Sequence, residues 1–152
     1  PEEDPGKLQF VKHKFMTSRS FENIFYTQRN AVRDRVQFFL DRPDWYKAKG
    51  IPHTLGLLLH GPPGTGKSST VKAVARVAGR HIVNVNMSQV KTKSQLVKLF
   101  YEDTLYVVEK EGSAAESYSI PIDKRVYVLE DIDAMANEVV HWVLSNEREI
   151  DL

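Results

Sequence analysis

The stretch Gly61-Pro62-Pro63-Gly64-Thr65-Gly66-Lys67-Ser68 decides the fold of this chain. It follows an apolar run at residues 55–59 and opens into a segment with helical spacing, so it joins a strand to a helix. Glycines in such a loop let successive backbone N–H groups turn inward around phosphate oxygens, and the helix points its partly positive N-terminus at the same anion. A plain Gly/Pro turn is the competing interpretation. The flanking strand and helix favour a phosphate loop, which predicts that the protein binds a nucleoside triphosphate.

Two side chains extend this prediction beyond the backbone. Lys67 places a full positive charge against the terminal phosphates, and the Ser68 hydroxyl is a typical oxygen ligand for Mg²⁺. No Asn-Lys-x-Asp motif for reading a guanine base is present in the sequence, which disfavours a GTPase.

The composition is that of an ordinary globular domain. The chain has 152 residues, of which 41% are hydrophobic and 27% charged, so it is long enough to bury a core. Its formal net charge of +1 makes no global electrostatic case for nucleic acid or an acidic membrane. No apolar run approaches the roughly 20 residues that span a bilayer, and no signal peptide opens the chain. The absence of cysteine excludes disulfides and thiolate metal sites and fits an intracellular protein.

Periodicity predicts an alternation of strands and helices. Residues 104–123 are ambiguous between a longer helix and a strand, and Trp45 with Tyr46 is expected to pack on the preceding helix in preference to forming a ligand platform. The apolar residues from Val139 to Leu144 indicate one more helix. The other expected elements are an edge strand within 8–16, helices at 28–40, 43–50, 67–79 and 95–101, buried strands at 54–60 and 125–130, a further strand at 81–86, and a polar loop at 88–94.

The strand at 125–130 ends in the acidic run Glu130-Asp131-Ile132-Asp133. In open α/β sheets ligands bind outside the carboxyl ends of the strands, so this run and the phosphate loop are expected at one crevice. One carboxylate would hold Mg²⁺, and a second would orient the attacking water and take its proton. Exposed loop acids are the alternative. The order of the two motifs favours a catalytic and metal-binding role for Glu130 and Asp131, alongside Lys67 and Ser68.

The phosphate loop together with Leu129-Glu130-Asp131-Ile132-Asp133 resembles the Walker A and Walker B motifs of the AAA ATPases. The segments 39–46 and 87–96, and the pair Ser68-Ser69, resemble the mitochondrial Bcs-type members, which translocate the folded Rieske iron–sulfur protein. The resemblance implies an α/β fold, the P-loop NTPase three-layer α/β/α arrangement with a parallel sheet, and ATP and Mg²⁺ as cofactors. The nucleotide-binding residues that it implies are Asn23, Ile24 and Phe25 at the adenine, and Gly61, Pro62, Pro63, Gly64, Thr65, Gly66, Lys67, Ser68 and Ser69.

The same resemblance implies different roles for Glu130 and Asp131. Most AAA proteins end this strand in Asp-Glu, the Asp for Mg²⁺ and the Glu for water. Here the order is Glu130-Asp131, so positional transfer gives the metal to Glu130 and the water to Asp131. Asp is one methylene shorter than Glu, and catalytic geometry tolerates little misplacement.

The resemblance also implies a domain organisation. Residues 1–19 are expected to form an N-terminal linker and edge segment, and residues 20–152 the N-terminal part of an AAA core. An AAA core has a further strand between the phosphate-loop strand and the acidic strand. We expect that sensor strand, the arginine finger and the lid domain to lie beyond Leu152, which makes the core incomplete in this chain.

The function that the resemblance implies is Mg²⁺-dependent ATP hydrolysis by a homo-oligomeric ring, a hexamer or heptamer, that remodels or translocates a protein client. The loop around Val90 lacks the aromatic residue that threading unfoldases place there, which argues against gripping an unfolded chain. The alternatives are a nucleic-acid-coupled AAA+ motor of the helicase or clamp-loader type, a small-molecule kinase, and a non-hydrolysing ATP-binding scaffold. Neither nucleic acid nor membrane is indicated as a partner, and the implied location is intracellular, at the mitochondrial inner membrane for a Bcs-type protein.

Overall fold

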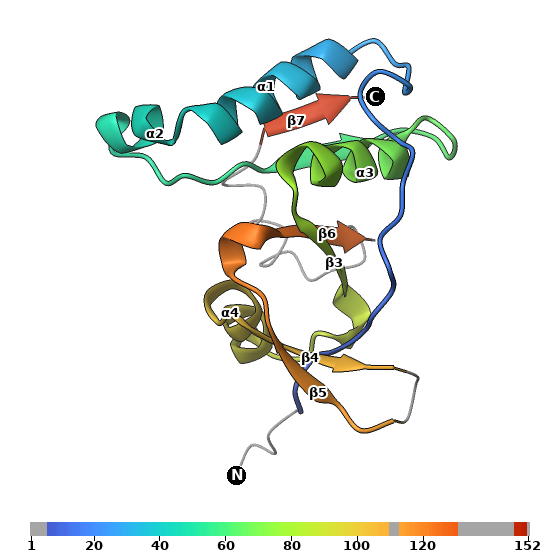
Figure 1. The fold of residues 1–152 in the computed structure, drawn as a ribbon, viewed down its shortest axis with the longest axis vertical. Coiled ribbons are helices and arrows are strands. Elements are labelled where there is room, and N and C mark those ends of the chain that lie inside the picture. The colour runs from blue at the N-terminus through green and yellow to red at the C-terminus, as the bar shows by residue number, and fades with distance from the viewer. Residues whose placement is uncertain (1–5, 110–112, 131–147, 152) are drawn as a thin grey trace. The chain divides into compact units, whose positions relative to one another are not determined.

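A computed structural model describes residues 6–109, 113–130 and 148–151 of the chain (Figure 1). These residues fall into two compact units. One, the loop unit, holds residues 17–79 and 148–151; the other, the sheet unit, holds residues 6–16 and the described part of 80–130. Each unit has its own secondary structure and is described by itself.

The loop unit contains the phosphate loop and the elements on either side of it. Its helices are α1 (Arg29–Asp41), α2 (Pro43–Lys49) and α3 (Lys67–Ala78), and its strands are β2 (Leu57–His60) and β7 (Arg148–Asp151), which pair in parallel. The predicted helices and the phosphate-loop strand are confirmed, although the strand begins at Leu57 and its side chains are half-buried rather than covered on both faces.

The core of the loop unit lies between α1 and α3. Val32 and Val36 are one helical turn apart on α1, and both are almost fully buried with Ala73 of α3. Phe21 and Ile24, in the segment before α1, complete this cluster. The half-buried side chains packed against it are Tyr26, Leu40, Leu55, Leu57 and Val74.

Helix α2 is short, and its aromatic residues pack back onto α1. Pro43 occupies its first turn, where a missing N–H costs nothing, and Gly50 ends it with a left-handed φ of 64°. The ring of Trp45 meets Phe38 edge-on at 5.3 Å, and the ring of Tyr46 meets Phe39 at 5.9 Å. The predicted packing of this aromatic pair on the preceding helix is confirmed.

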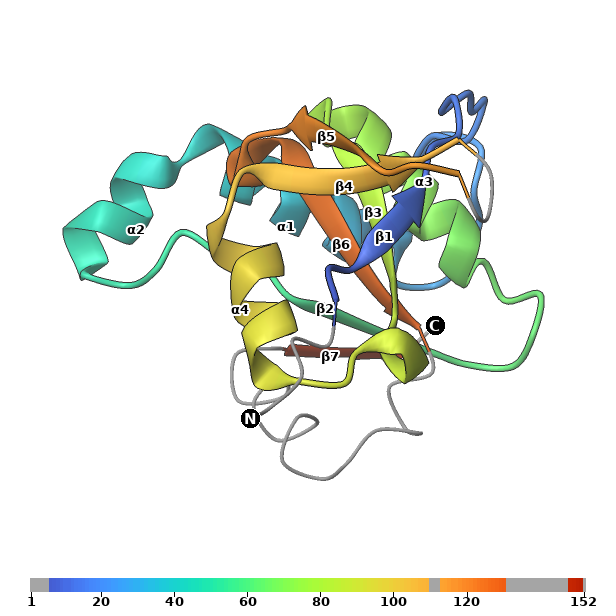
Figure 2. The same cartoon turned by 90° about the horizontal axis from the view of Figure 1, so that it is seen from below.

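The sheet unit holds two groups of strands and one helix (Figure 2). The two strands predicted at 81–86 and 125–130 are confirmed as β3 (His81–Asn86) and β6 (Arg125–Glu130), and they form a parallel pair. A second sheet has the order β1-β4-β5, built from β1 (Gln9–Val11), β4 (Thr104–Val108) and β5 (Glu116–Ser119). Strand β1 lies at the edge of this sheet, parallel to β4, and β4 and β5 are antiparallel. The ambiguous segment is therefore a β-hairpin.

Helix α4 (Lys93–Tyr101) begins two residues before the predicted start because a capping box defines its N-terminus. The Thr92 hydroxyl accepts the backbone N–H of Gln95 at 3.4 Å, and the Gln95 side-chain oxygen accepts the backbone N–H of Thr92 at 3.2 Å. The Gln95 amide also donates to the Gly6 carbonyl at 3.0 Å, which ties the N-terminal segment to the helix.

One expectation about the end of the chain is wrong. The sequence predicted no strand after residue 130, yet Arg148–Asp151 forms β7 and pairs in parallel with β2, from Leu57 opposite Arg148 to His60 opposite Asp151. A four-residue strand with a single apolar residue leaves almost no periodicity, and its pairing relies on backbone groups that a pattern does not reveal. The helix expected from Val139 to Leu144 lies outside the described residues. Across the described ranges, none of the helices has the length and apolar character needed to span a bilayer.

Candidate nucleotide-binding site

The loop between β2 and α3 owes its shape to glycines. Gly61, Gly64 and Gly66 have φ angles of 144°, 82° and 102°, a region that residues with a side chain rarely adopt. Gly66 is also the residue that immediately precedes α3. These three glycines let the backbone turn tightly between Gly61 and Gly66 and enter α3 directly, which suits a loop whose backbone N–H groups bind phosphate.

The first turn of α3 leaves backbone donors available. The N–H groups of Lys67, Ser68 and Ser69 have no intrahelical acceptor, because the first four donors of any helix lack one. None of them donates to another residue in the described part of the chain. The buried Thr70 anchors this turn, since its N–H and its hydroxyl both donate to the Gly66 carbonyl, at 2.9 and 2.8 Å. A rigid helix end with unsatisfied N–H groups fits a bound anion.

Lys67 carries the positive charge of the loop. Its ammonium group donates to the carbonyl oxygens of Gly61 and Pro62, the second at 3.1 Å, so the side chain folds back over the loop. The Thr65 hydroxyl donates to the same Pro62 carbonyl at 2.8 Å. These contacts hold a cation against the loop backbone, where the oxygens of a polyphosphate would meet it. The residues present therefore fit the phosphates of a nucleotide.

The predicted metal ligands are described only in part. Ser68 is exposed on the first turn of α3, and its hydroxyl is a hard oxygen ligand of the kind that Mg²⁺ prefers. Glu130 is exposed at the end of β6, opposite Asn86 at the end of β3, and Asp131 lies outside the described residues. Within the described ranges, no group of three His, Asp or Glu side chains could hold a metal. Because Glu130 and the loop belong to different units, their approach stays a prediction.

The three residues of the predicted adenine segment, Asn23, Ile24 and Phe25, lie in different environments. The Asn23 side chain is engaged locally, accepting the Ser20 N–H at 2.9 Å and donating to the Ser18 carbonyl at 2.6 Å. Ile24 is 4% exposed and belongs to the core. The ring of Phe25 is 82% exposed, with the Arg29 guanidinium 5.4 Å from its centre. A base in this region would meet the Phe25 ring and backbone groups, since the other two side chains are occupied.

Glu22, an acidic residue next to this segment, accepts a hydrogen bond from the Ser20 side chain. This hydrogen bond lowers the pKa of the Glu22 carboxyl, with smaller contributions from the Arg76 and Arg33 guanidinium groups. Glu22 is therefore a firmly ionised carboxylate at neutral pH, on the exposed side of the segment.

Tyr26, which is not part of any predicted motif, lies beside the loop. Tyr26 directly follows the predicted adenine segment, and its ring carbon Cδ1 is 3.9 Å from the position that a Cβ on Gly66 would occupy. The place of Tyr26 next to Phe25 was visible in the sequence, but its contact with a glycine forty residues later is set by the fold.

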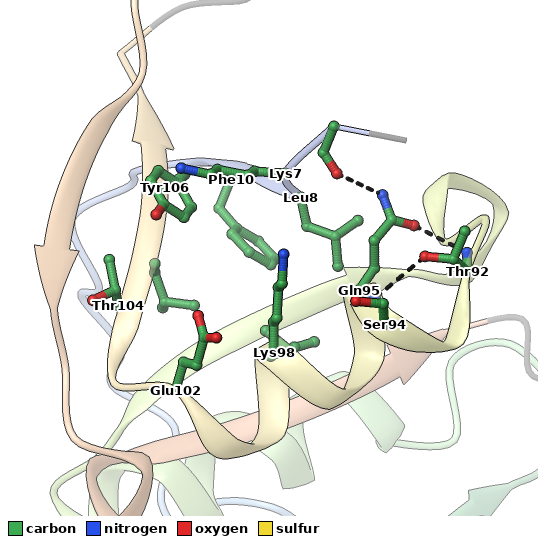
Figure 3. A pocket seen from close by; sticks show the side chains of 13 residues that line it. Lys7, Leu8, Phe10, Thr92, Ser94, Gln95, Lys98, Glu102, Thr104 and Tyr106 are labelled. Carbon is green, nitrogen blue, oxygen red and sulfur yellow. Dashed lines mark hydrogen bonds between the residues drawn. The ribbon is translucent and has the colours of Figure 1, made fainter. Parts of the chain in front are cut away.

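A pocket lies in the sheet unit, and none of the predicted site residues lines it. This pocket of about 140 Å³ is bounded by the N-terminal segment, α4 and β4 (Figure 3). Leu8, Phe10 and Leu99 contribute apolar surface, Lys98 points into it from α4, and the Lys7 ammonium lies 4.2 Å from the centre of the Tyr106 ring. Gln95 forms one wall and links the segments that enclose the pocket.

The α/β elements and the loop that joins β2 to α3 define a nucleotide-binding fold of the P-loop NTPase class. Residues 57–149 match the family described as "ATPase family associated with various cellular activities (AAA)". This chain therefore belongs to the AAA family, as the sequence predicted.

Several curated relatives are similar to parts of this chain. Human "Mitochondrial chaperone BCS1" is 59% identical over 44 residues, which are 29% of this chain and 10% of that protein. Human "ATPase family gene 2 protein homolog A" is 35% identical over 85 residues, 52% of this chain and 10% of that protein. The "Proteasome-activating nucleotidase" of Methanosphaerula palustris is 29% identical over 123 residues, 81% of this chain and 27% of that protein. The matched part of the chain thus spans about a quarter or less of these relatives.

Proposed function

We propose that this chain binds ATP with Mg²⁺ and hydrolyses it as part of an oligomeric AAA ATPase that acts on a protein client. The observation that carries the proposal is the loop from Gly61 to Ser68, which combines left-handed glycines, unsatisfied helix N–H groups and the Lys67 ammonium. Membership of the AAA family supports the same assignment.

The contacts of Lys67 suggest how the triphosphate is held. In the structure its ammonium donates to two neutral carbonyls, those of Gly61 and Pro62. Phosphate oxygens are stronger acceptors for this cation because the hydrogen bonds are charge-assisted. Lys67 would therefore exchange the carbonyls for the β- and γ-phosphates, while the N–H groups of the loop and of the first turn of α3, through Ser69, hold the remaining oxygens.

Mg²⁺ and the acidic strand end would complete the site. Ser68 would bind the metal directly, with Glu130 as a further ligand, and the bound ion would neutralise charge that develops on the phosphates. Asp131 would orient the attacking water and accept its proton as the water oxygen bonds to the γ-phosphorus and the bond to ADP breaks. Asn23, Ile24 and Phe25 would contact the adenine, chiefly through backbone groups and the exposed Phe25 ring.

Two of the relatives suggest a protein client. One is named a mitochondrial chaperone and another a proteasome-activating nucleotidase. We therefore propose that the protein forms a homo-oligomeric ring, a hexamer or heptamer, that remodels or translocates a protein. We further propose that residues 20–152 belong to the AAA core, that residues 1–19 form its N-terminal edge segment, and that the location is mitochondrial.

Titration of the protein with Mg·ATP tests the proposal. Lys67→Ala removes the ammonium opposite the phosphates and should weaken binding by about 10- to 100-fold, the range expected for lost hydrogen bonds to a charged group. Lys72→Ala is the matched control, because Lys72 is an exposed lysine on the same helix. Equal affinity in the two variants would refute the proposed role of the loop. Stimulation of hydrolysis by DNA or RNA with strong salt dependence would favour a nucleic-acid motor over a protein remodeller.

A further inference from the structure

Tyr26 lies beside the phosphate loop, next to Gly66. Its ring carbon Cδ1 is 3.9 Å from the position of a Cβ on Gly66, the left-handed residue that leads into α3. The Tyr26 side chain also packs against the buried cluster that includes Ile24 and Val32. The ring is therefore held between the core of the loop unit and the phosphate loop, where small movements of the loop change its surroundings.

The hydroxyl of Tyr26 is buried without a hydrogen-bond partner among the described residues, which is unfavourable for the stability of the nucleotide-free protein. The oxygen is buried from solvent, and no hydrogen-bond partner for it is found among the described residues. A buried hydroxyl without a partner is unfavourable, and nearly all such groups in folded proteins are bonded. Within the described residues the hydroxyl has no interaction that a phenylalanine at this position would lack, so we expect its contribution in another state of the protein.

The loop beside Tyr26 is the part of the site that nucleotide binding would rearrange. Lys67 now holds the carbonyl oxygens of Gly61 and Pro62, and it would release both when its ammonium turns to the phosphates. Binding thus brings new oxygen acceptors to the loop: the phosphate oxygens themselves and the two released carbonyls. Tyr26 also directly follows, in sequence, the residues proposed to meet the adenine, while its ring lies beside Gly66 of the phosphate loop.

We propose that Tyr26 is a positioning residue for the nucleotide, whose buried hydroxyl gains an oxygen acceptor at the phosphate loop when a polyphosphate binds there. The inference rests on the proposed function, because it requires that the loop binds ATP. It assigns to the side chain of Tyr26 a selectivity for the polyphosphate end of the ligand. The affinity for nucleotides whose phosphates occupy the loop should depend on the hydroxyl. The affinity for adenosine, which carries no phosphate, should not.

The test compares the wild-type protein with Tyr26→Phe in affinity and in thermal stability. The ring and its contact with Gly66 remain, and only the hydroxyl is removed. Without nucleotide the variant should melt at the same temperature as the wild type or slightly above it. Its affinity for Mg·ATP and Mg·ADP should fall by about three- to tenfold, the fold-change of one hydrogen bond, while its affinity for adenosine stays the same. Tyr101→Phe, the same change at a 74% exposed tyrosine, is the matched control and should alter neither quantity.

Each result of this comparison is decisive. A purely structural tyrosine would lower the melting temperature of the free protein and leave nucleotide affinity unchanged, and either observation would overturn the proposal. An equal loss of affinity for adenosine and ATP would also overturn it, because the hydroxyl would then act at the base. If the wild-type protein itself did not bind Mg·ATP, the proposed function would fail and this inference with it, whereas wild-type binding with an unaltered variant would remove the inference alone.

Discussion

Arg125 is a buried cation with no carboxylate among its described partners, and replacing it should destabilise the sheet unit. Its side chain is almost fully buried at the start of β6. The guanidinium donates to the carbonyls of Ile120, Leu99 and Glu102 at 2.8, 3.0 and 3.0 Å. Two of these carbonyls lie at the C-terminal end of α4, where a positive charge is favourable to the helix dipole.

The expected cost of Arg125→Met follows from these contacts. Leu99 keeps the Tyr127 hydroxyl as a donor at 2.8 Å, whereas Ile120 and Glu102 have no other side-chain donor among the described residues. Both carbonyls are partly buried, so losing their donor costs about 1 kcal/mol each, the lower end of the range for an unsatisfied acceptor, and removing a buried charge offsets part of that loss. We expect the free energy of unfolding to fall by about 1–2 kcal/mol. Arg125→Lys should cost less, because it keeps the charge and loses the fork of donors.

Equilibrium denaturation in urea, followed by circular dichroism, measures this loss in the full protein. Arg33→Met is the matched control, because Arg33 is a half-exposed arginine whose ion pair with Asp34 lies on the surface. That change should stay within about 0.5 kcal/mol of the wild type. If Arg125→Met changed the free energy of unfolding as little as Arg33→Met, the hydrogen bonds of the Arg125 guanidinium to the carbonyls at the end of α4 would not stabilise this unit, and the prediction would be wrong.

Three further predictions concern other parts of the chain. Asp131→Asn should leave Mg·ATP bound but slow its hydrolysis about 100-fold or more in a turnover assay, since the change removes the proposed general base; normal turnover would assign that role to another residue. Burial raises the pKa of the Tyr127 hydroxyl above its ordinary value of 10.0, so the stability that it contributes is complete below that pH and is lost as the pH rises through the higher folded-state pKa. In Tyr127→Phe the free energy of unfolding should therefore fall less steeply with pH above that value, as denaturation at a series of pH values would measure. An unchanged slope would argue against the role of the Tyr127 hydroxyl. Thr92→Ala should cost about 1 kcal/mol by removing the N-cap of α4, and undiminished amide protection in the first turn of that helix would count against the capping box.

Much of the fold could be predicted because its signals are local. The phosphate loop is recognised from consecutive residues, and the spacing of Val32, Val36 and Phe39 predicts α1 without any tertiary information. The hairpin of β4 and β5 could not be resolved this way. A short apolar run such as Leu105–Val108 suits a helix or a strand equally, and its pairing with β1 and β5 decides the outcome.

The candidate site was likewise predictable only in part. The residue types at Lys67 and Ser68 predict phosphate and metal chemistry, because that chemistry depends on the side chains themselves. The carbonyls that Lys67 now holds, and the contact of Tyr26 with Gly66, depend on how distant segments pack, and no sequence pattern contains them. Arg125 is a further example, since a charged residue at the start of a strand gives no sign of the helix end that it will satisfy.

A crystal structure of the protein with Mg²⁺ and a non-hydrolysable ATP analogue tests the central claim most directly. We predict that the triphosphate lies within the loop from Gly61 to Ser68, with the Lys67 ammonium moved from the Gly61 and Pro62 carbonyls onto phosphate oxygens. An analogue bound elsewhere, or a loop in which Lys67 still holds both carbonyls beside the bound analogue, would contradict it.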